Sequence, residues 1–191
     1  MSTYRPWQLL RSWSRGRLPV LIAGAAALAL AAVMAVGLSR GVGDVPLGRA
    51  SAGFEVAADF TLPGFGGEPF TLSDHAGGPV FVYFWASWCA PCLREAPLIE
   101  RLWPEYERAG YTFIGVNIMD SERDARAFIE RFDITFPMVI DDGGAVYLEY
   151  GVYGLPEAFF LRPGLVVNQK FIGELTEPEL RRMLDRLVDG S

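Results

Sequence analysis

Apolar runs alternate with amphipathic segments from residue 54 onward, and this alternation predicts the order of strands and helices. Apolar runs rich in β-branched and aromatic residues are typical of buried strands. Strands are predicted at 80–85, 111–118, 137–140, 158–161 and 165–172. Helices are predicted at 90–108, 121–132, 142–150 and 176–188, the first of them bent at Pro97. A small hairpin with arms at 58–62 and 68–72 precedes these elements.

The order of the elements limits the fold. A strand–helix–strand–helix run, followed by a hairpin and a final helix, predicts a central mixed sheet with helices on both faces. Two helix starts carry capping signals, because Ser121 stands three residues before Asp124 and Thr176 three before Glu179. Residues 54–191 are therefore predicted to form one α/β domain.

The N-terminal part shows a different pattern, since residues 20–38 carry no charge and are rich in Ala, Leu and Val. The run is close to the roughly 20 residues that a membrane-spanning helix needs. Arginines without acidic residues precede it, which favours an N-terminus in the cytoplasm. These are Arg5, Arg11, Arg15 and Arg17. The alternative is a cleaved signal peptide with a weak cleavage site at Val33-Met34-Ala35.

The predicted division of the chain has four parts. They are a cytoplasmic segment 1–18, a transmembrane anchor 19–38, a linker 39–53 rich in Gly and small residues, and an extracytoplasmic domain 54–191. All 23 acidic residues but only 12 of the 17 basic ones follow residue 40, which gives that part a formal charge of −11. Such a charge makes nucleic acid an improbable partner.

The chain has two cysteines, and both lie in the segment Trp88-Cys89-Ala90-Pro91-Cys92. A C-x-x-C pair serves either as a redox dithiol or as half of a zinc site. A zinc site needs four ligands, and here no third cysteine exists and His75 is the only histidine. A purely structural disulfide is also disfavoured, because so short a loop constrains little of the unfolded chain. We therefore predict a redox pair, with no metal and no cofactor.

The position of the pair supports this chemistry. It lies where the predicted strand 80–85 ends and the helix 90–108 begins. A helix N-terminus favours an anion, so Cys89 is expected to have a lowered pKa and to be the attacking sulfur. Cys92, one turn further along, would resolve the mixed disulfide. Pro91 fits the first helical turn, where its missing N–H costs nothing.

Several segments resemble the membrane-anchored TlpA/ResA/CcmG (DsbE) family of extracytoplasmic thiol-disulfide oxidoreductases, which have the thioredoxin-like fold. They are Phe84-Trp85-Ala86-Ser87-Trp88-Cys89-Ala90-Pro91-Cys92, Asp59-Phe60-Thr61-Leu62, Gly115-Val116-Asn117 and Gly151-Val152-Tyr153-Gly154-Leu155-Pro156-Glu157. The resemblance covers residues 54–188 and implies a thioredoxin-like domain with an extra N-terminal hairpin.

The resemblance also implies roles for single residues. A cis peptide before Pro156 would lie beside the dithiol, with the Leu155 backbone binding a client chain and Trp88 bordering the client groove. An ordinary trans turn is the alternative. Glu95 and Glu157 become candidates for taking the proton from Cys92, although each alone would be interpreted as a surface acid. Tyr83 stands where thioredoxins carry an aspartate, and it is otherwise a core aromatic.

The function implied is reduction of client disulfides outside the cytoplasmic membrane. The implied client is apocytochrome c, and the implied electron donor is a membrane protein of the CcdA/DsbD type. A copper-site assembly protein as client and a disulfide-forming oxidant are alternatives. A peroxiredoxin is disfavoured, because Ala86 occupies the place of the Thr or Ser that it needs. A tethered module that only binds partners is disfavoured by the intact dithiol.

Overall fold

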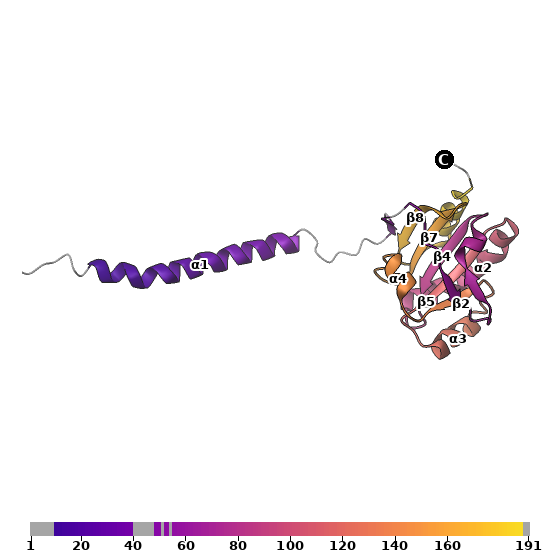
Figure 1. The fold of residues 1–191 in the computed structure, drawn as a ribbon, viewed down its shortest axis with the longest axis horizontal. Coiled ribbons are helices and arrows are strands. Elements are labelled where there is room, and N and C mark those ends of the chain that lie inside the picture. The colour runs from indigo at the N-terminus through magenta and orange to yellow at the C-terminus, as the bar shows by residue number, and fades with distance from the viewer. Residues whose placement is uncertain (1–9, 40–47, 51, 54, 189–191) are drawn as a thin grey trace, which may run out of the picture. The chain divides into compact units, whose positions relative to one another are not determined.

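A computed structural model describes residues 10–39, 48–50, 52–53 and 55–188. The chain divides into two units, Met1–Val45 and Pro46–Ser191, and each is described by itself. The first contains helix α1, Leu10–Ser39, with Pro19 inside it (Figure 1). Within the described ranges, no helix is long and apolar enough to cross a membrane. The anchor at 19–38 stays a prediction from sequence.

The second unit is built on a mixed sheet, as predicted, with six strands where the sequence predicted five. Its spatial order is β1-β8-β7-β4-β5-β6. The strands are β1 Gly48–Ala50, β4 Val80–Trp85, β5 Thr112–Ile118, β6 Met138–Asp141, β7 Glu157–Arg162 and β8 Val166–Ile172. Strands β4, β5 and β6 run parallel, whereas β7 pairs antiparallel with β4 and β8 antiparallel with β7.

Strand β1 differs from the sequence-based expectation, which assigned residues 39–53 to a linker. Gly48–Ala50 pair antiparallel with the end of β8, from Lys170 to Ile172. Three residues with two glycine or alanine side chains give no periodic signal, so only the pairing with β8 reveals the strand. Residues 40–47 and 51 of the predicted linker lie outside the described residues.

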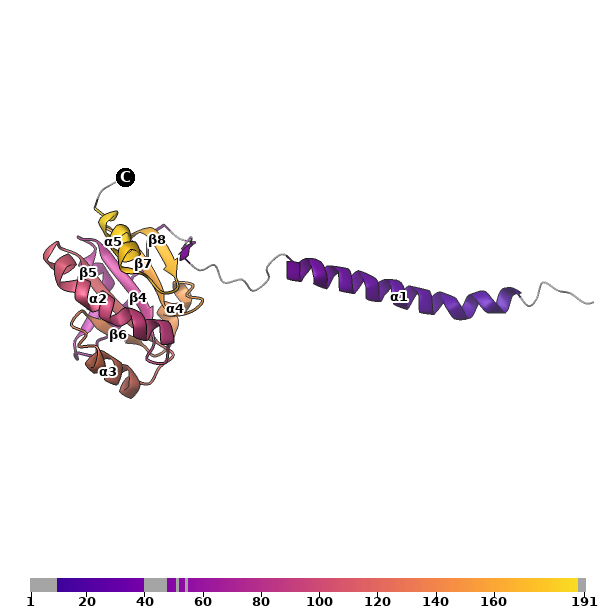
Figure 2. The same cartoon turned by 180° about the vertical axis from the view of Figure 1, so that it is seen from behind.

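Side chains of β4 alternate between two apolar layers. Phe81, Tyr83 and Trp85 point to one face of the sheet, which we call the dithiol face, and Val80, Val82 and Phe84 point to the other. Helices α2 Ala90–Arg108, α3 Glu122–Arg131 and α5 Glu177–Asp185 pack on the dithiol face. Figure 2 shows α2 and α5 in front of the strands. Every residue of β4 is buried, so the strand is covered on both faces of the sheet.

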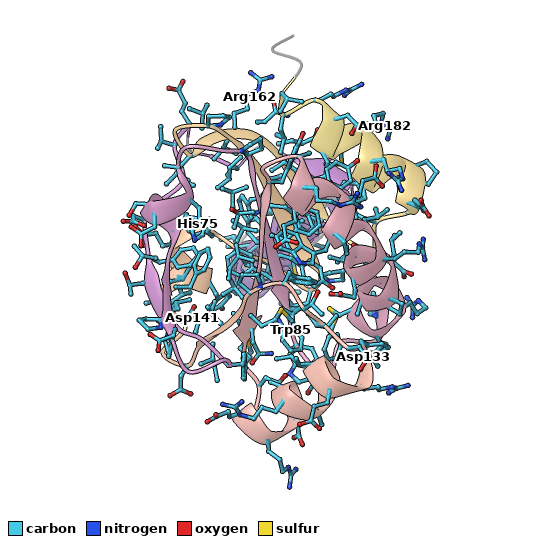
Figure 3. All side chains as sticks on the ribbon, turned by 90° about the vertical axis from the view of Figure 1, so that its right-hand side faces the viewer. His75, Trp85, Asp133, Asp141, Arg162 and Arg182 are labelled. Carbon is cyan, nitrogen blue, oxygen red and sulfur yellow. A yellow bond between two sulfur atoms is a disulfide. The ribbon has the colours of Figure 1, made fainter. Side chains whose placement is uncertain are left out.

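The opposite face, which we call the α4 face, is covered by the hairpin and a short helix. The hairpin strands are β2 Thr61–Pro63 and β3 Pro69–Thr71, followed by the 3-10 turn η2 Leu72–His75 and later by α4 Ala145–Glu149. His75 stacks on Phe70, with ring centroids 4.5 Å apart. In Figure 3 His75 lies well away from Trp85, the last residue of β4, so the only histidine is not near the dithiol.

Helix ends follow the capping signals in the sequence. The Ser121 hydroxyl accepts the Asp124 N–H at 3.1 Å, and α3 begins at the next residue. Thr176 and Glu179 form the predicted capping box at the start of α5. Helix α2 has the predicted bounds and contains Pro97 and Pro104. The capping signals therefore mark where α3 and α5 begin.

Candidate active site

The two cysteines lie at the N-terminus of α2, where Cys89 is the N-cap residue. They form a disulfide, and both are almost fully buried. The Cys92 N–H donates to Cys89 Sγ at 3.2 Å. In the reduced protein the same N–H and the positive end of the helix stabilise a thiolate at Cys89. The role of Cys89 as the attacking sulfur stays a prediction from the sequence.

Asp120 holds the loop that leads into the dithiol. Its carboxylate accepts the Ser87 N–H at 2.6 Å and the Ser87 hydroxyl at 2.8 Å. It also accepts the Asn117 side-chain amide at 3.0 Å and the Ser121 N–H at 2.9 Å. One carboxylate therefore joins the ends of β4 and β5, because parallel neighbouring strands finish at the same edge of the sheet.

Trp88 forms one wall of a groove beside the dithiol. The residue is 58% exposed, and its indole N–H donates to the Met119 carbonyl at 2.8 Å. The groove has a volume of about 260 Å³ and is mainly apolar. Its lining residues are Trp88, Ile118, Met119, Tyr147, Val152, Tyr153, Gly154 and Leu155. We call it the Trp88–Leu155 groove.

The Leu155–Pro156 peptide is cis, as the resemblance implied. The Pro156 carbonyl accepts the Gly173 N–H at 2.9 Å, which ties the cis segment to the loop after β8. Leu155 belongs to the groove lining and also packs against the apolar layers on both faces of the sheet. The structure thus places Trp88 and Leu155 along one groove.

Glu95 belongs to α2 and is buried, with 1% of its surface exposed. Its Oε1 accepts the Leu175 N–H at 3.1 Å, and its Oε2 accepts the Tyr83 hydroxyl at 3.5 Å. Burial raises the pKa of the Glu95 carboxyl to about 8. The two hydrogen bonds oppose this rise in pKa, and the nearby charge of Glu174 adds to it. Glu95 lies one helical turn after Cys92, so the two side chains occupy the same side of α2.

Tyr83 is the partner that sequence reasoning missed. The sequence places a core aromatic where thioredoxins carry an aspartate, and the structure adds that its hydroxyl donates to Glu95 Oε2. Burial, and then the charge of Glu95, raise the pKa of Tyr83 well above its ordinary value. The sequence signal was the replacement of the usual acid in β4 by a side chain that still ends in a proton donor.

Glu157 lies on the other side of the sheet from Glu95. The side chains of Ala158 and Phe160 belong to the dithiol face, whereas Phe159 belongs to the α4 face, so Glu157 points to the α4 face. There its Oε1 pairs with Lys170 Nζ at 2.5 Å, and its Oε2 accepts the Tyr153 N–H at 3.0 Å. The structure therefore does not bring the two glutamates together.

Among the described residues, no three His, Cys, Asp or Glu side chains cluster in a way that could hold a metal ion. The geometry is that of a dithiol at a helix N-terminus, a cis-proline loop and a buried acid. Residues 55–170 match the AhpC/TSA family, which is more than half of the chain.

The chain belongs to the AhpC/TSA family.

Two relatives match most of the same residues. The thiol-disulfide oxidoreductase ResA of Geobacillus kaustophilus is 37% identical over 131 residues, which are 69% of this chain and 75% of that protein. The thioredoxin-like protein YneN of Bacillus subtilis is 36% identical over 132 residues, or 68% of this chain and 76% of that protein. This AhpC/TSA family member is a thiol-disulfide oxidoreductase.

Solved structures give the same fold. A protein described as thiol:disulfide interchange protein DsbE from Chlorobium tepidum is 28% identical, with a TM-score of 0.66. The match covers 75% of this chain and 99% of that one. StoA from Bacillus subtilis is 25% identical with a TM-score of 0.59, covering 68% and 98% of the two chains. The thioredoxin-like fold expected from the resemblance is thereby confirmed.

Proposed function

We propose that the protein reduces disulfides in exported client proteins. The Cys89 thiolate attacks one sulfur of a client disulfide, forming a mixed disulfide and releasing the other client sulfur as a thiolate. Cys92, deprotonated, then attacks Cys89, which frees the second client thiolate and leaves the Cys89–Cys92 disulfide. Two electrons pass to the client, and the protein is oxidised. The buried, helix-capping dithiol carries this proposal.

Glu95 is proposed to take the proton from Cys92 in the second step. A general base works best when its pKa lies near the working pH, and burial raises the pKa of Glu95 to about 8. The carboxyl lies one turn beyond Cys92 on α2 and is closed to solvent. The reverse transfer, from Glu95 to a leaving Cys92 thiolate, would serve when the disulfide is reduced again.

Apocytochrome c is proposed as the client, since its haem-attachment cysteines must be reduced before haem is attached. The segment Gly151-Val152-Tyr153-Gly154-Leu155-Pro156-Glu157 supports this, because it resembles the CcmG pattern. A membrane donor of the CcdA/DsbD type would return electrons to the dithiol. The competing proposals are a copper-site assembly protein as client and a role as disulfide-forming oxidant.

An extracytoplasmic location at the cytoplasmic membrane is proposed from the arginine-flanked uncharged run at 20–38. Fractionation of cells, followed by protease treatment of intact spheroplasts, tests it. Digestion of the domain from the outside would support the location. A domain protected until the cytoplasmic membrane is broken would contradict it.

Trapping identifies the client. A Cys92→Ser variant cannot complete the second step, so it should accumulate mixed disulfides on Cys89, whereas a Cys89→Ser, Cys92→Ser double variant should trap nothing. Apocytochrome c among the trapped proteins would support the proposed client. Trapping of proteins without a haem-attachment motif alone would reject that client.

The reduction potential of the Cys89/Cys92 couple separates the reductant from the oxidant. A value near that of thioredoxin, about −270 mV, would support a reductant. A value near that of a strong oxidant, about −120 mV, would point to disulfide formation instead.

A further inference from the structure

Lys170 is the only lysine in the chain, all 16 other basic residues being arginine. It lies in β8 with 1% of its surface exposed, on the α4 face of the sheet. Lysine is rarely buried unless it is paired, because its charge loses hydration. A single lysine at a fully buried position therefore calls for a reason that its contacts should provide.

The Lys170 ammonium contacts a carboxylate, a backbone carbonyl and two aromatic rings. Its Nζ lies 2.5 Å from Glu157 Oε1 and donates to the Gly151 carbonyl at 2.7 Å. It also lies over the rings of Tyr153 and Phe159, 4.7 and 5.1 Å from their centroids. Glu157 in turn accepts the Tyr153 N–H at 3.0 Å. Both members of the ion pair thus hold the same short segment.

That segment is the start of the loop 151–156, which we call the client loop. It contains Tyr153, Gly154 and Leu155 of the Trp88–Leu155 groove and ends in the cis peptide before Pro156. Glu157 follows Pro156 directly, and Lys170 reaches the first residue of the loop. The ion pair therefore fixes the loop at both ends, from the side of the sheet opposite the dithiol.

Stability alone does not account for this pair. Replacing a buried ion pair by apolar residues of similar size is often neutral or stabilising, whereas removing one partner leaves a costly lone charge. Lysine suits the position because its compact ammonium offers three donors, whereas the guanidinium of arginine is a broad planar fork. The contacts instead specify one conformation of the client loop.

We propose that Lys170 and Glu157 are positioning residues, which hold the client loop so that the Tyr153 ring and the Leu155 backbone are presented to a peptide client beside Cys89. The inference rests on the proposed reduction of protein disulfides. It gives Glu157 a role other than proton transfer. It also makes client binding, and not the reactivity of the dithiol, the step that depends on the pair.

The test uses the full-length protein with Glu157→Leu and Lys170→Met combined, which removes both charges and leaves neither alone. Two substrates are compared: a disulfide-bonded Cys-x-x-Cys-His peptide and the small disulfide hydroxyethyl disulfide. For the peptide, the KM of the double variant should rise roughly tenfold, as expected when about 1.4 kcal/mol of binding is lost. For the small disulfide, kcat and KM should stay at the wild-type values. An Arg101→Met variant, which breaks an exposed ion pair with Glu177, should match the wild type on both substrates.

Amide hydrogen exchange supplies a second measurement. The Tyr153 amide should lose protection in the double variant, which removes its acceptor Glu157, while amides of β4 and β5 keep theirs. A wild-type peptide KM in a folded double variant, or loss of protection throughout the sheet in that variant, would overturn the inference. A wild-type protein that reduces neither substrate would instead reject the proposed function.

Discussion

The Tyr83 hydroxyl lies 3.5 Å from Glu95 Oε2, in the closed layer between β4 and α2. Thioredoxins carry an acid in this strand, whereas here the strand supplies a proton donor and the helix supplies the acid. The acid, Glu95, therefore lies on α2 and its hydrogen-bond partner, Tyr83, on β4, and both face the same layer. The predictions below separate their contributions.

Glu95→Gln should remove a pH-dependent step from the release of a mixed disulfide. With a pKa of about 8, Glu95 is mostly protonated at pH 7 and mostly ionised at pH 9. The wild-type rate should therefore rise through this range, because only the carboxylate accepts the Cys92 proton. The variant should lose that rise, with a rate about a hundredfold lower above pH 8. Stopped-flow measurement of mixed-disulfide release from pH 6 to 9 checks this, and superimposable profiles would remove Glu95 from the step.

Tyr83→Phe should move the midpoint of the same profile upward. The Tyr83 hydrogen bond lowers the pKa of Glu95, since it stabilises the carboxylate, so its loss leaves burial less opposed. NMR titration of the Glu95 side-chain carboxyl carbon measures the pKa directly. An unchanged or lower midpoint would show that the hydroxyl does not stabilise the carboxylate. The phenyl ring keeps the packing of this layer, so the variant should fold.

Stability should fall as the pH rises from about 4.5 to about 8. The Glu95 carboxyl ordinarily titrates near 4.5, but in the folded protein its pKa is about 8. Between these values the folded state holds one proton more than the unfolded state, so the free energy of unfolding decreases with pH. The loss should amount to a few kcal/mol across the window. Urea unfolding at several pH values should give a flatter curve for Glu95→Gln, and parallel curves would contradict the shifted pKa.

Asp120→Ala should destabilise the domain and disturb the dithiol together. The variant removes the acceptor for Ser87, Asn117 and Ser121, and hydrogen bonds to a charged group are the stronger ones. A loss of about 2 kcal/mol is expected in urea unfolding. The rate of attack on hydroxyethyl disulfide should also change, because Ser87 leads into Cys89.

Ser121→Ala is the matched control for Asp120. It removes the N-cap of α3, where the hydroxyl accepts the Asp124 N–H, and should cost about 1 kcal/mol. It leaves the Ser87 contacts of Asp120 in place, so the dithiol should keep its wild-type reactivity. Equal rate changes in the two variants would show that the effect of Asp120 is only loss of stability.

Periodicity and capping signals predicted most of the fold, as α2 shows with its start after Cys89 and its end at Arg108. The dithiol followed from its local motif, whereas the cis peptide before Pro156 and the groove position of Trp88 were implied by the family resemblance. The sequence did not predict which side chains belong to which of the two apolar layers. Because β4 is buried on both faces, its sequence does not say which face α2 covers, and hence which side chains Glu95 meets.

Glu157 illustrates the same limit. Its place beside Pro156 suggested a partner of the dithiol, but strand alternation turns its side chain to the α4 face. Lys170, thirteen residues later, could be matched to it only once the register of β7 and β8 was known, with Glu157 opposite Ile172. Contacts that depend on sheet register therefore cannot be predicted from short motifs, whereas contacts within one helix can.

Strand β1 covers part of the outer edge of β8, and this pairing limits where the chain can be shortened. An uncovered edge strand presents unpaired N–H and C=O groups, which recruit further strands from other molecules. A soluble version that begins at residue 51 or later would lose Gly48–Ala50 and leave the segment of β8 from Lys170 to Ile172 open. Truncations intended for biophysical work should therefore begin before Gly48, or self-association at the β8 edge will compete with the reactions being measured.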